Sequence, residues 1–417
     1  MLNQFSRTQL LLGADNMDRL ANAKVAVFGI GGVGGYVLEA LARSGVGSFV
    51  LVDDDKVCLT NINRQIIATR KTVGKYKVDV MKERILEINP DAEVEVRKCF
   101  YLPENAHEFA FEEYSYVVDA VDTVTAKIEI IMRAKEAGCS IVLFPEGRLP
   151  CVPVTDPVTE GTAQLIRKLC VPVYVVHAAG AALTFPKWAE HPRRGEIHIS
   201  GAKLFDAEQL ADMTDAEIES AVGAALRHDE LALCKDIAFH AKACAKGAEN
   251  ILYRCPHCNE EYTIQTEDDR IFCSACGFSA SIDAKGYLDC ARFRNIIDWY
   301  AWQGEQLAAQ HPVLQAHMTL DAVGDDGNMQ SGIGKGEARM DETTFSFAGE
   351  AFGNPFSFSL PLAKVGTFPL TTGKWFDCYV EKRQYRFLPP RGAEVAKWAQ
   401  YADVLRAERL CADGKTV

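Results

Sequence analysis

The stretch KVAVFGIGGVGGYVLEALARSGVGSFVLVD, residues 24–53, decides the fold of the N-terminal part of the chain. Its two apolar runs, at 24–28 and 48–53, predict buried parallel strands, and the residues between them follow a helical pattern. Glycines in the first turn permit a tight bend and let a phosphate approach backbone N–H groups at the start of the helix. The stretch therefore predicts a strand–turn–helix–strand unit that binds a nucleotide. The glycines in question are Gly29, Gly31, Gly32 and Gly34.

Strand and helix patterns continue to alternate up to residue 144. A second helix is predicted over about 74–88, followed by the strand EVEVR (93–97), a strand in YVVDAVD (116–122) and a helix over 124–137. The apolar run SIVLF (140–144) predicts one more strand. This alternation predicts an α/β fold with a Rossmann-like, doubly wound parallel sheet.

Charged residues after the glycine turn distinguish between kinds of nucleotide enzyme. Asp53 ends the second strand 19 residues after Gly34, where it can accept hydrogen bonds from ribose hydroxyls. A glycine turn alone would suggest an NAD-dependent dehydrogenase, which needs no cations converging on the phosphates. In an adenylating enzyme, Arg64 and Lys77 would stabilise the negative charge that develops when a carboxylate attacks the α-phosphorus. Asp122 would hold Mg²⁺ on the departing pyrophosphate.

At this point the chain resembles the ubiquitin-activating-enzyme-like ThiF/MoeB/HesA superfamily and, within it, the bacterial tRNA threonylcarbamoyladenosine dehydratases. The likeness spans about residues 3–140 and includes RTQLLLG, LVDDDKVCLTNINRQI and VGKYKVDVMKERILEINP. It implies that a carboxylate on tRNA is activated as an acyl-adenylate and then cyclised with loss of water. It also implies a homodimer through the N-terminal domain, in which Arg7 reaches the neighbouring active site. By this resemblance ATP and Mg²⁺ would be bound by Gly32, Asp53, Asn61, Arg64, Lys77 and Asp122.

A local excess of positive charge accompanies these motifs. Residues 64–84 contain seven basic and two acidic side chains, although the whole chain has a net charge of −12. The global charge argues against a protein that coats nucleic acid broadly, whereas the local patch could contact tRNA phosphates. A solvated helix face is an equally good interpretation of the same residues.

Beyond about residue 140 the resemblance changes. FPEGRLP, GTAQLIRKL, VPVYVV and RRGEIHI, spread over residues 140–235, resemble the second half of a PlsC-type 1-acylglycerol-3-phosphate acyltransferase. That resemblance implies that Glu146, Gly147 and Arg148 contact the acceptor phosphate, and it allows peripheral lipid or membrane contact by the C-terminal part. Acyl transfer needs a His general base with an Asp five residues later, and none of the nine histidines has one. This segment is therefore expected to be catalytically inactive by itself.

Four cysteines form two CxxC pairs with 14 residues between them. Such pairs suit four thiolates around a tetrahedral Zn²⁺, which leaves no open position for water, so the predicted role is structural. The segment resembles a zinc ribbon. The predicted ligands are Cys255, Cys258, Cys273 and Cys276.

The rest of the chain completes the predicted arrangement of domains. Residues 317–390 alternate polar and apolar side chains and predict a small antiparallel β domain, and a helix follows it. No signal peptide or membrane span is predicted, so a cytoplasmic location is expected. The predicted segments are an ATP-binding adenylating domain (1–140), a partial acyltransferase-like segment with a helical extension (141–250), a zinc ribbon (251–290) and a helix plus β domain (291–417).

Three functions compete at this stage. The favoured one is an ATP-dependent enzyme that adenylates and then cyclises threonylcarbamoyladenosine in tRNA, because every nucleotide-binding residue is present. The alternatives are a phospholipid-biosynthesis acyltransferase and a nucleotide-binding, zinc-stabilised scaffold with neither activity.

Overall fold

The computed structural model describes residues 3–146, 149–155, 158–159, 161–324, 329–381 and 383–412. The chain divides into two compact units, Met1–Leu143 and Phe144–Val417. Within the described ranges, every helix is too short or too polar to cross a membrane.

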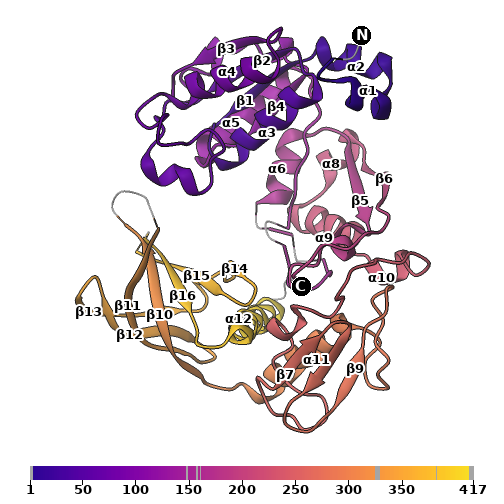
Figure 1. Ribbon diagram of the computed structural model, residues 1–417, viewed down its shortest axis with the longest axis vertical. Helices are drawn as coiled ribbons and strands as arrows, with labels where there is room; N and C mark the ends of the chain where they lie inside the picture. The colour runs from indigo at the N-terminus through magenta and orange to yellow at the C-terminus, as the bar shows by residue number, and fades with distance from the viewer. Residues whose placement is uncertain are drawn as a thin grey trace. The chain divides into compact units, whose positions relative to one another are not determined.

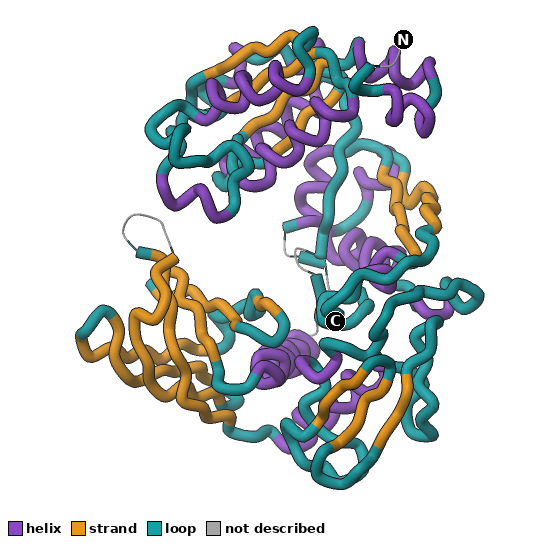
Figure 2. The backbone as a smooth tube through the Cα atoms, viewed as in Figure 1, coloured by secondary structure: helices purple, strands orange, loops and turns teal. Residues whose placement is uncertain are grey.

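The first unit is built on a four-stranded parallel sheet with the order β3-β2-β1-β4 (Figures 1 and 2). This order places β1 at the centre and reverses the direction of winding between β1 and β4. The predicted strands at 24–28 and 93–97 are confirmed with the same bounds, and those at 48–53 and 116–122 end one and three residues earlier than predicted. The strands are β1 (Lys24–Phe28), β2 (Ser48–Val52), β3 (Glu93–Arg97) and β4 (Tyr116–Asp119).

Helices cover both faces of this sheet because its strands alternate their side chains between two cores. Val25 and Val27 of β1 pack with α3 and α4, whereas Ala26 and Phe28 pack on the opposite face with α5. The predicted helices of this unit are confirmed, and two short helices precede the sheet. The helices are α1 (Ser6–Leu12), α2 (Ala14–Ala21), α3 (Gly32–Ser44), α4 (Lys77–Ile88) and α5 (Val124–Glu136), with 3₁₀ turns η1 (Leu59–Asn63), η2 (Ala106–Glu108) and η3 (Phe111–Glu113).

The prediction of a strand in SIVLF is wrong. Residues 140–144 have no regular structure, and β4 ends the sheet on that side. A strand of a doubly wound sheet needs cover on both faces, whereas Val142 and Phe144 are 67% and 87% exposed. The apolar run therefore lacks the packing that would make it a fifth strand.

The second unit begins with a two-stranded antiparallel sheet, β5-β6, supported by short helices. A small core of apolar side chains from α6, α8 and α9 packs against Phe205 at the end of β6. The elements are α6 (Thr162–Leu169), β5 (Val173–Ala179), α7 (Ala181–Thr184), β6 (His198–Phe205), α8 (Ala207–Asp212), α9 (Asp215–Leu226), α10 (Glu230–Leu233) and η4 (Ala248–Asn250).

The cysteine segment forms a three-stranded antiparallel sheet, which is followed by a helix. Trp299 of that helix packs on the side chains of this small sheet, so the helix and the cysteine segment share a core. The elements are β7 (Ile264–Glu267), β8 (Arg270–Cys273), β9 (Ser279–Ser281) and α11 (Ile296–Gln310).

A seven-stranded antiparallel sheet and a long helix complete the second unit, in agreement with the predicted β domain. Trp398 and Tyr401 of α12 are fully buried against the sheet, while Ala396 of the same helix packs into the core of the cysteine segment. The division of this unit at 250 and 290 remains a prediction. The elements are β10 (Leu314–Val323), β11 (Met329–Met340), β12 (Thr344–Ala351), β13 (Asn354–Pro361), β14 (Leu370–Thr371), β15 (Trp375–Val380), β16 (Arg383–Leu388) and α12 (Gly392–Ala412).

Candidate nucleotide site and metal centre

The glycine turn after β1 contains two kinds of glycine. Gly29 has a φ of +91°, and a Cβ there would overlap the carbonyl of Ala120 just beyond β4. A Cβ on Gly34 would overlap the carbonyl of Gly29. These two glycines are therefore required by the packing of the chain itself.

Gly31 and Gly32 have a different environment. A Cβ on Gly31 would lie 3.9 Å from its nearest neighbour and one on Gly32 would lie 3.5 Å away, both ordinary contacts. The fold does not need these glycines, yet they stand at the N-terminus of α3, where backbone N–H groups attract anions. The absent side chains leave backbone accessible to a phosphate, as the sequence predicts.

Asp53 ties the end of β2 to this turn. Its Oδ2 accepts a hydrogen bond from the Ile30 N–H at 2.6 Å, and its Oδ1 accepts one from the Asp55 N–H at 2.8 Å. Burial raises the pKa of the carboxyl group, and the hydrogen bond from Ile30 opposes the rise. Each carboxylate oxygen retains a second lone pair, so the predicted bonds from ribose hydroxyls remain possible.

Lys77 opens α4 and brings a buried ammonium group to the same place. Its Nζ lies 2.6 Å from Oδ2 of Asp55 and 3.9 Å from Oδ1 of Asp53. Carboxylate oxygens of Asp53, Asp54 and Asp55 lie within 4.8 Å of one another, which is close enough for a cation. Because Lys77 already offsets part of their charge, this group is less apt for Mg²⁺ than an unpaired carboxylate.

Arg64 follows η1 and is exposed beside the glycine turn. Its Nη1 donates to the carbonyl of Thr60 and to Oδ1 of Asn63, both at 3.1 Å. A guanidinium group has five N–H donors, so several remain for a phosphate. Asn61 is buried instead, and its Oδ1 accepts the Cys58 N–H at 3.0 Å, which gives this residue a part in shaping the turn.

Gln65 is a residue of this site that the sequence analysis missed. Its side chain is buried, and its Oε1 has no hydrogen-bond partner among the described residues. The Nε2 of the same amide is the atom nearest to the Cβ position of Gly31. A buried, unpartnered polar atom at an open glycine turn fits a bound ligand. The available signal was a polar side chain directly after Arg64 and before the apolar residues Ile66 and Ile67.

Asp122 belongs to the group of residues around the glycine turn, at the carboxyl ends of the strands, that is called the nucleotide crevice below. It follows β4 by three residues, close to the Ala120 carbonyl that Gly29 approaches. The side chain is exposed and makes no ion pair or hydrogen bond with the part of the chain that the structure describes. Asp53, Lys77 and Asp122 thus all lie at the carboxyl edge of the sheet. The winding reverses between β1 and β4, and ligands of such sheets usually bind at this edge beside the reversal.

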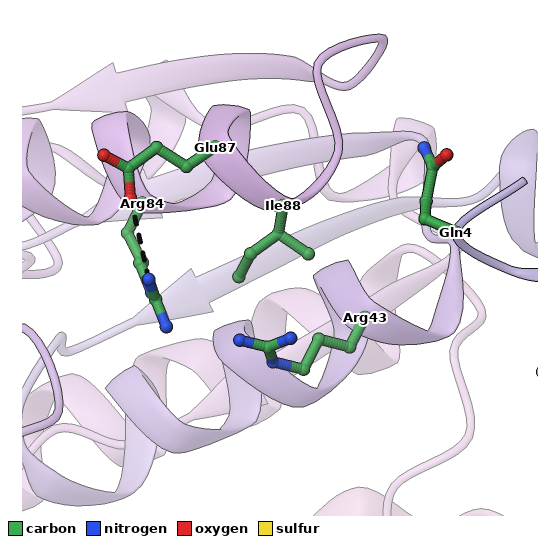
Figure 3. A pocket seen from close by; sticks show the side chains of 5 residues that line it. All are labelled: Gln4, Arg43, Arg84, Glu87 and Ile88. Atoms are coloured by element: carbon green, nitrogen blue, oxygen red, sulfur yellow. Dashed lines mark ion pairs between the residues drawn. The ribbon is translucent and has the colours of Figure 1, made fainter.

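A separate hollow of about 350 Å³ lies at the opposite ends of α3 and α4 (Figure 3). It is lined by Gln4, Arg43, Arg84, Glu87 and Ile88. Both helices begin at the nucleotide crevice, so their last turns face away from it. The two arginines bind Glu39 there, and Arg84 also pairs with Glu87, so the hollow has no excess of charge that would indicate a ligand.

The four predicted zinc ligands come together in the second unit. Their sulfur atoms all lie within 4.8 Å of one another, with separations of 3.7 Å for Cys255–Cys276 and 3.8 Å for Cys258–Cys273. Tetrahedral Zn²⁺ with Zn–S bonds of about 2.3 Å requires sulfurs about 3.8 Å apart. The cluster therefore fits Zn²⁺, which would join β8 to the loop before β7.

The acceptor-phosphate residues receive no comparable support. Gly147 and Arg148 lie outside the described residues, and Glu146 is a half-buried residue of a turn.

Comparison with known proteins places the N-terminal part of the chain in a family. Residues 5–144 match the ThiF family. A tRNA threonylcarbamoyladenosine dehydratase of Bacillus subtilis is 50% identical over 131 residues, which are 31% of this chain and 52% of that protein. One from Escherichia coli is 46% identical over 128 residues, which are 31% and 48% of the two chains. A crystal structure of E. coli TcdA in complex with ATP is 39% identical and covers 40% of this chain and 72% of that one, with a TM-score of 0.35. The chain spans about half the length of the curated relatives it matches.

Proposed function

We propose that the ThiF-family domain, residues 5–144, uses ATP and Mg²⁺ to adenylate the carboxylate of threonylcarbamoyladenosine in tRNA and then closes that group into a ring. The bacterial dehydratases named above support this reaction. The observation that carries the proposal is the carboxyl edge of the sheet: Gly31 and Gly32 leave the start of α3 open, Lys77 pairs with the aspartates after β2, and Asp122 follows β4.

The first chemical step is supported by the charges around this crevice. A carboxylate oxygen forms a bond to the α-phosphorus, and pyrophosphate leaves. Arg64 and Lys77 would offset the negative charge that develops on the phosphoryl oxygens. Mg²⁺ held at Asp122 would neutralise charge on the departing pyrophosphate. Ring closure within the activated group then releases AMP, so the substrate loses one water overall.

The four-cysteine centre is proposed to hold one Zn²⁺ with a structural role. All four positions of a tetrahedral site would be filled by thiolates, which leaves none for a substrate or a water molecule. Its position in the second unit supports a separate role from adenylation.

A homodimer through the N-terminal domain is also proposed. Leu10 and Leu11 of α1 are 86% and 87% exposed, and adjacent exposed leucines of this kind are common where a second subunit packs. Arg7 is exposed on the same helix, as its predicted role at a neighbouring active site requires. Light scattering of the full chain after size-exclusion chromatography would measure the mass directly.

The deciding experiment is ATP–pyrophosphate exchange with tRNA that carries threonylcarbamoyladenosine and with tRNA that lacks it. Exchange is expected only with the modified tRNA. The variant R64A should slow it by a factor of about 10² to 10³, the usual effect of losing one donor to a developing oxyanion. Because Arg64 is exposed, the free energy of unfolding of R64A should differ from that of the unaltered protein by no more than about 0.5 kcal/mol.

Two outcomes would contradict this proposal. ATP binding without tRNA-dependent exchange would favour the scaffold, in which the nucleotide is bound but not used. If R64A loses exchange only because the folded protein is destabilised to the same extent, the role assigned to Arg64 is wrong. Acyl transfer to lysophosphatidate is expected to be absent, because the His–Asp motif is missing.

A further inference from the structure

Residues 69–76, called the cationic loop below, connect the two sides of the nucleotide crevice. Arg64 and Gln65 lie shortly before the loop, and Lys77 follows it directly. All three belong to the crevice described above. The loop is therefore fixed next to the site of adenylation at both of its ends.

Hydrogen bonds hold the base of the cationic loop. The Val57 N–H donates to the carbonyl of Lys75 at 2.9 Å, and the Gly74 N–H donates to the carbonyl of Val57 at 2.8 Å. Val57 is buried and lies only four residues after Asp53. The loop is thus paired with the segment that contains the nucleotide-binding aspartate.

The tip of the loop is ordered by Thr72. Its hydroxyl group donates to the carbonyl of Ile67 at 2.8 Å and accepts the Thr69 N–H at 2.8 Å. Ile67 is buried in the core between the sheet and its helices. The backbone between these residues therefore has a defined conformation before any partner binds.

Ion pairs neutralise both acidic side chains of residues 64–84. Asp79 pairs with Lys98 at 2.8 Å, and Glu83 pairs with Lys75 at 3.5 Å. Lys77 and Arg84 are likewise paired, with Asp55 and Glu39. The excess charge of this stretch is therefore not spread evenly along it.

Arg70 and Lys71, at the tip of the cationic loop, carry much of the positive charge of residues 64–84 that no ion pair neutralises. Both side chains are exposed, and neither makes an ion pair within the described ranges. Lys56 stands at the base of the loop, where its Nζ lies 4.9 Å from the centre of the Tyr76 ring. It too is exposed without an ion pair in the described structure. These three cations lie on two chain segments, one after β2 and one before α4, that are paired through Val57, Gly74 and Lys75.

We propose that Arg70 and Lys71, assisted by Lys56, bind the phosphate backbone of the tRNA next to the nucleotide that is modified. This inference rests on the proposed function. Unpaired, exposed cations gain most from phosphates, because binding releases counterions from the nucleic acid and breaks no ion pair in the protein. An ordered loop also loses little conformational entropy on binding. Since the whole chain is acidic, a local patch is needed for contact with RNA at all.

The test compares the full-length chain with the double variant R70A/K71A in binding a full-length tRNA transcript at several salt concentrations. Loss of two phosphate contacts should reduce the slope of log K against log salt by about 1.4 to 1.8 and weaken binding on the order of 100-fold at 50 mM salt. Affinity for ATP should be unchanged. The control R19A/K24A removes two positive charges, one from α2 and one from the first residue of β1, and should keep the slope of the unaltered protein although it also breaks the ion pair between Lys24 and Glu113.

Two results would overturn the inference: an R70A/K71A slope equal to that of the unaltered chain, or no salt-dependent binding of tRNA by the unaltered chain. The exchange assay separates this failure from that of the proposed function. If R70A/K71A retains tRNA-dependent exchange with an unchanged KM for tRNA, the surface is wrong and the reaction stands. If the unaltered chain shows no exchange, the proposed function fails first.

Discussion

At the scale of the residue, Gly31 and Gly34 stand in one turn for different reasons. Gly34 is packed so tightly against Gly29 that no side chain fits, whereas the space beside Gly31 is open. The fold requires Gly34, whereas Gly31 is proposed to leave room for a ligand. The sequence shows a glycine at both positions, but it does not distinguish the two reasons for them.

This difference gives a paired prediction. G34A should be destabilised by at least about 3 kcal/mol, because a Cβ would overlap backbone that cannot move away easily. G31A should stay within about 1 kcal/mol of the unaltered protein, because no atom lies closer than 3.9 Å to a Cβ at this position. The methyl group would nevertheless occupy the phosphate side, so ATP binding should weaken at least tenfold. Chemical denaturation and calorimetric titration measure the two effects, and normal ATP affinity in G31A would mean that the phosphates lie elsewhere.

At the scale of the element, Glu39 holds α3 to α4. Its oxygens accept hydrogen bonds from Nε and Nη2 of Arg84, each at 2.9 Å, and from Arg43 in the next turn of its own helix. The hydrogen bond from Arg84 is the main reason that the pKa of Glu39 lies below its ordinary value. The two helices that begin at the nucleotide crevice are thereby fixed relative to each other at their far ends.

The variant E39Q should lose about 1 kcal/mol of stability at pH 7, a modest figure because both arginines are more than one third exposed. A carboxyl group with a lowered pKa in the folded protein stabilises it above the pKa of the unfolded chain, near 4.3, and loses this effect as the pH falls further. The difference between E39Q and the unaltered protein should therefore shrink from pH 5 towards pH 2. Urea denaturation across this range measures it, and a difference independent of pH would point to packing in place of charge.

The four-cysteine centre gives a second prediction at this scale. C255S should bind no zinc and should loosen β7–β9, because the proposed metal would link β8 to the loop before β7, and the apolar neighbours of both share a core with α11. Cys290 is the matched control: it belongs to the same segment and is half-buried, but it lies outside the cluster. C290S should keep one zinc per chain by elemental analysis. Equal metal content in the two variants would disprove the assignment of ligands.

At the scale of the whole molecule, the chain consists of two compact units with their own cores. Adenylation is proposed for the first unit and metal binding for the second. Thermal unfolding should therefore show two transitions. ATP at about 100 times its Kd should stabilise only the first unit, by about 2.7 kcal/mol, and a zinc chelator should lower only the transition of the second. A single transition that responds to both agents would show that the units unfold together.

The elements of the first unit were largely predictable, and the failures have identifiable causes. KVAVF and SFVLV are apolar, short and bounded by glycine, so their strands follow from local pattern alone. SIVLF has the same local pattern, but most of its side chains are not covered and remain exposed. The sequence pattern does not distinguish this segment from a buried strand. Gln65 was missed for a similar reason, because burial and the lack of a partner are properties of the surroundings.

The sequence by itself determined the parallel-sheet unit with its glycine turn, the charged residues proposed for adenylation and four thiolates at zinc spacing. These depend on periodicity, turn chemistry and short spacings, which a single segment carries within itself. Only the tertiary structure decided that the sheet stops at β4, that Gly31 is open while Gly34 is enclosed, and that Arg70 and Lys71 have no ion pair in the described structure while Lys75, Lys77 and Arg84 do. Each of these depends on residues far apart in the chain, and which charges and surfaces remain free is settled only when the fold has paired the others.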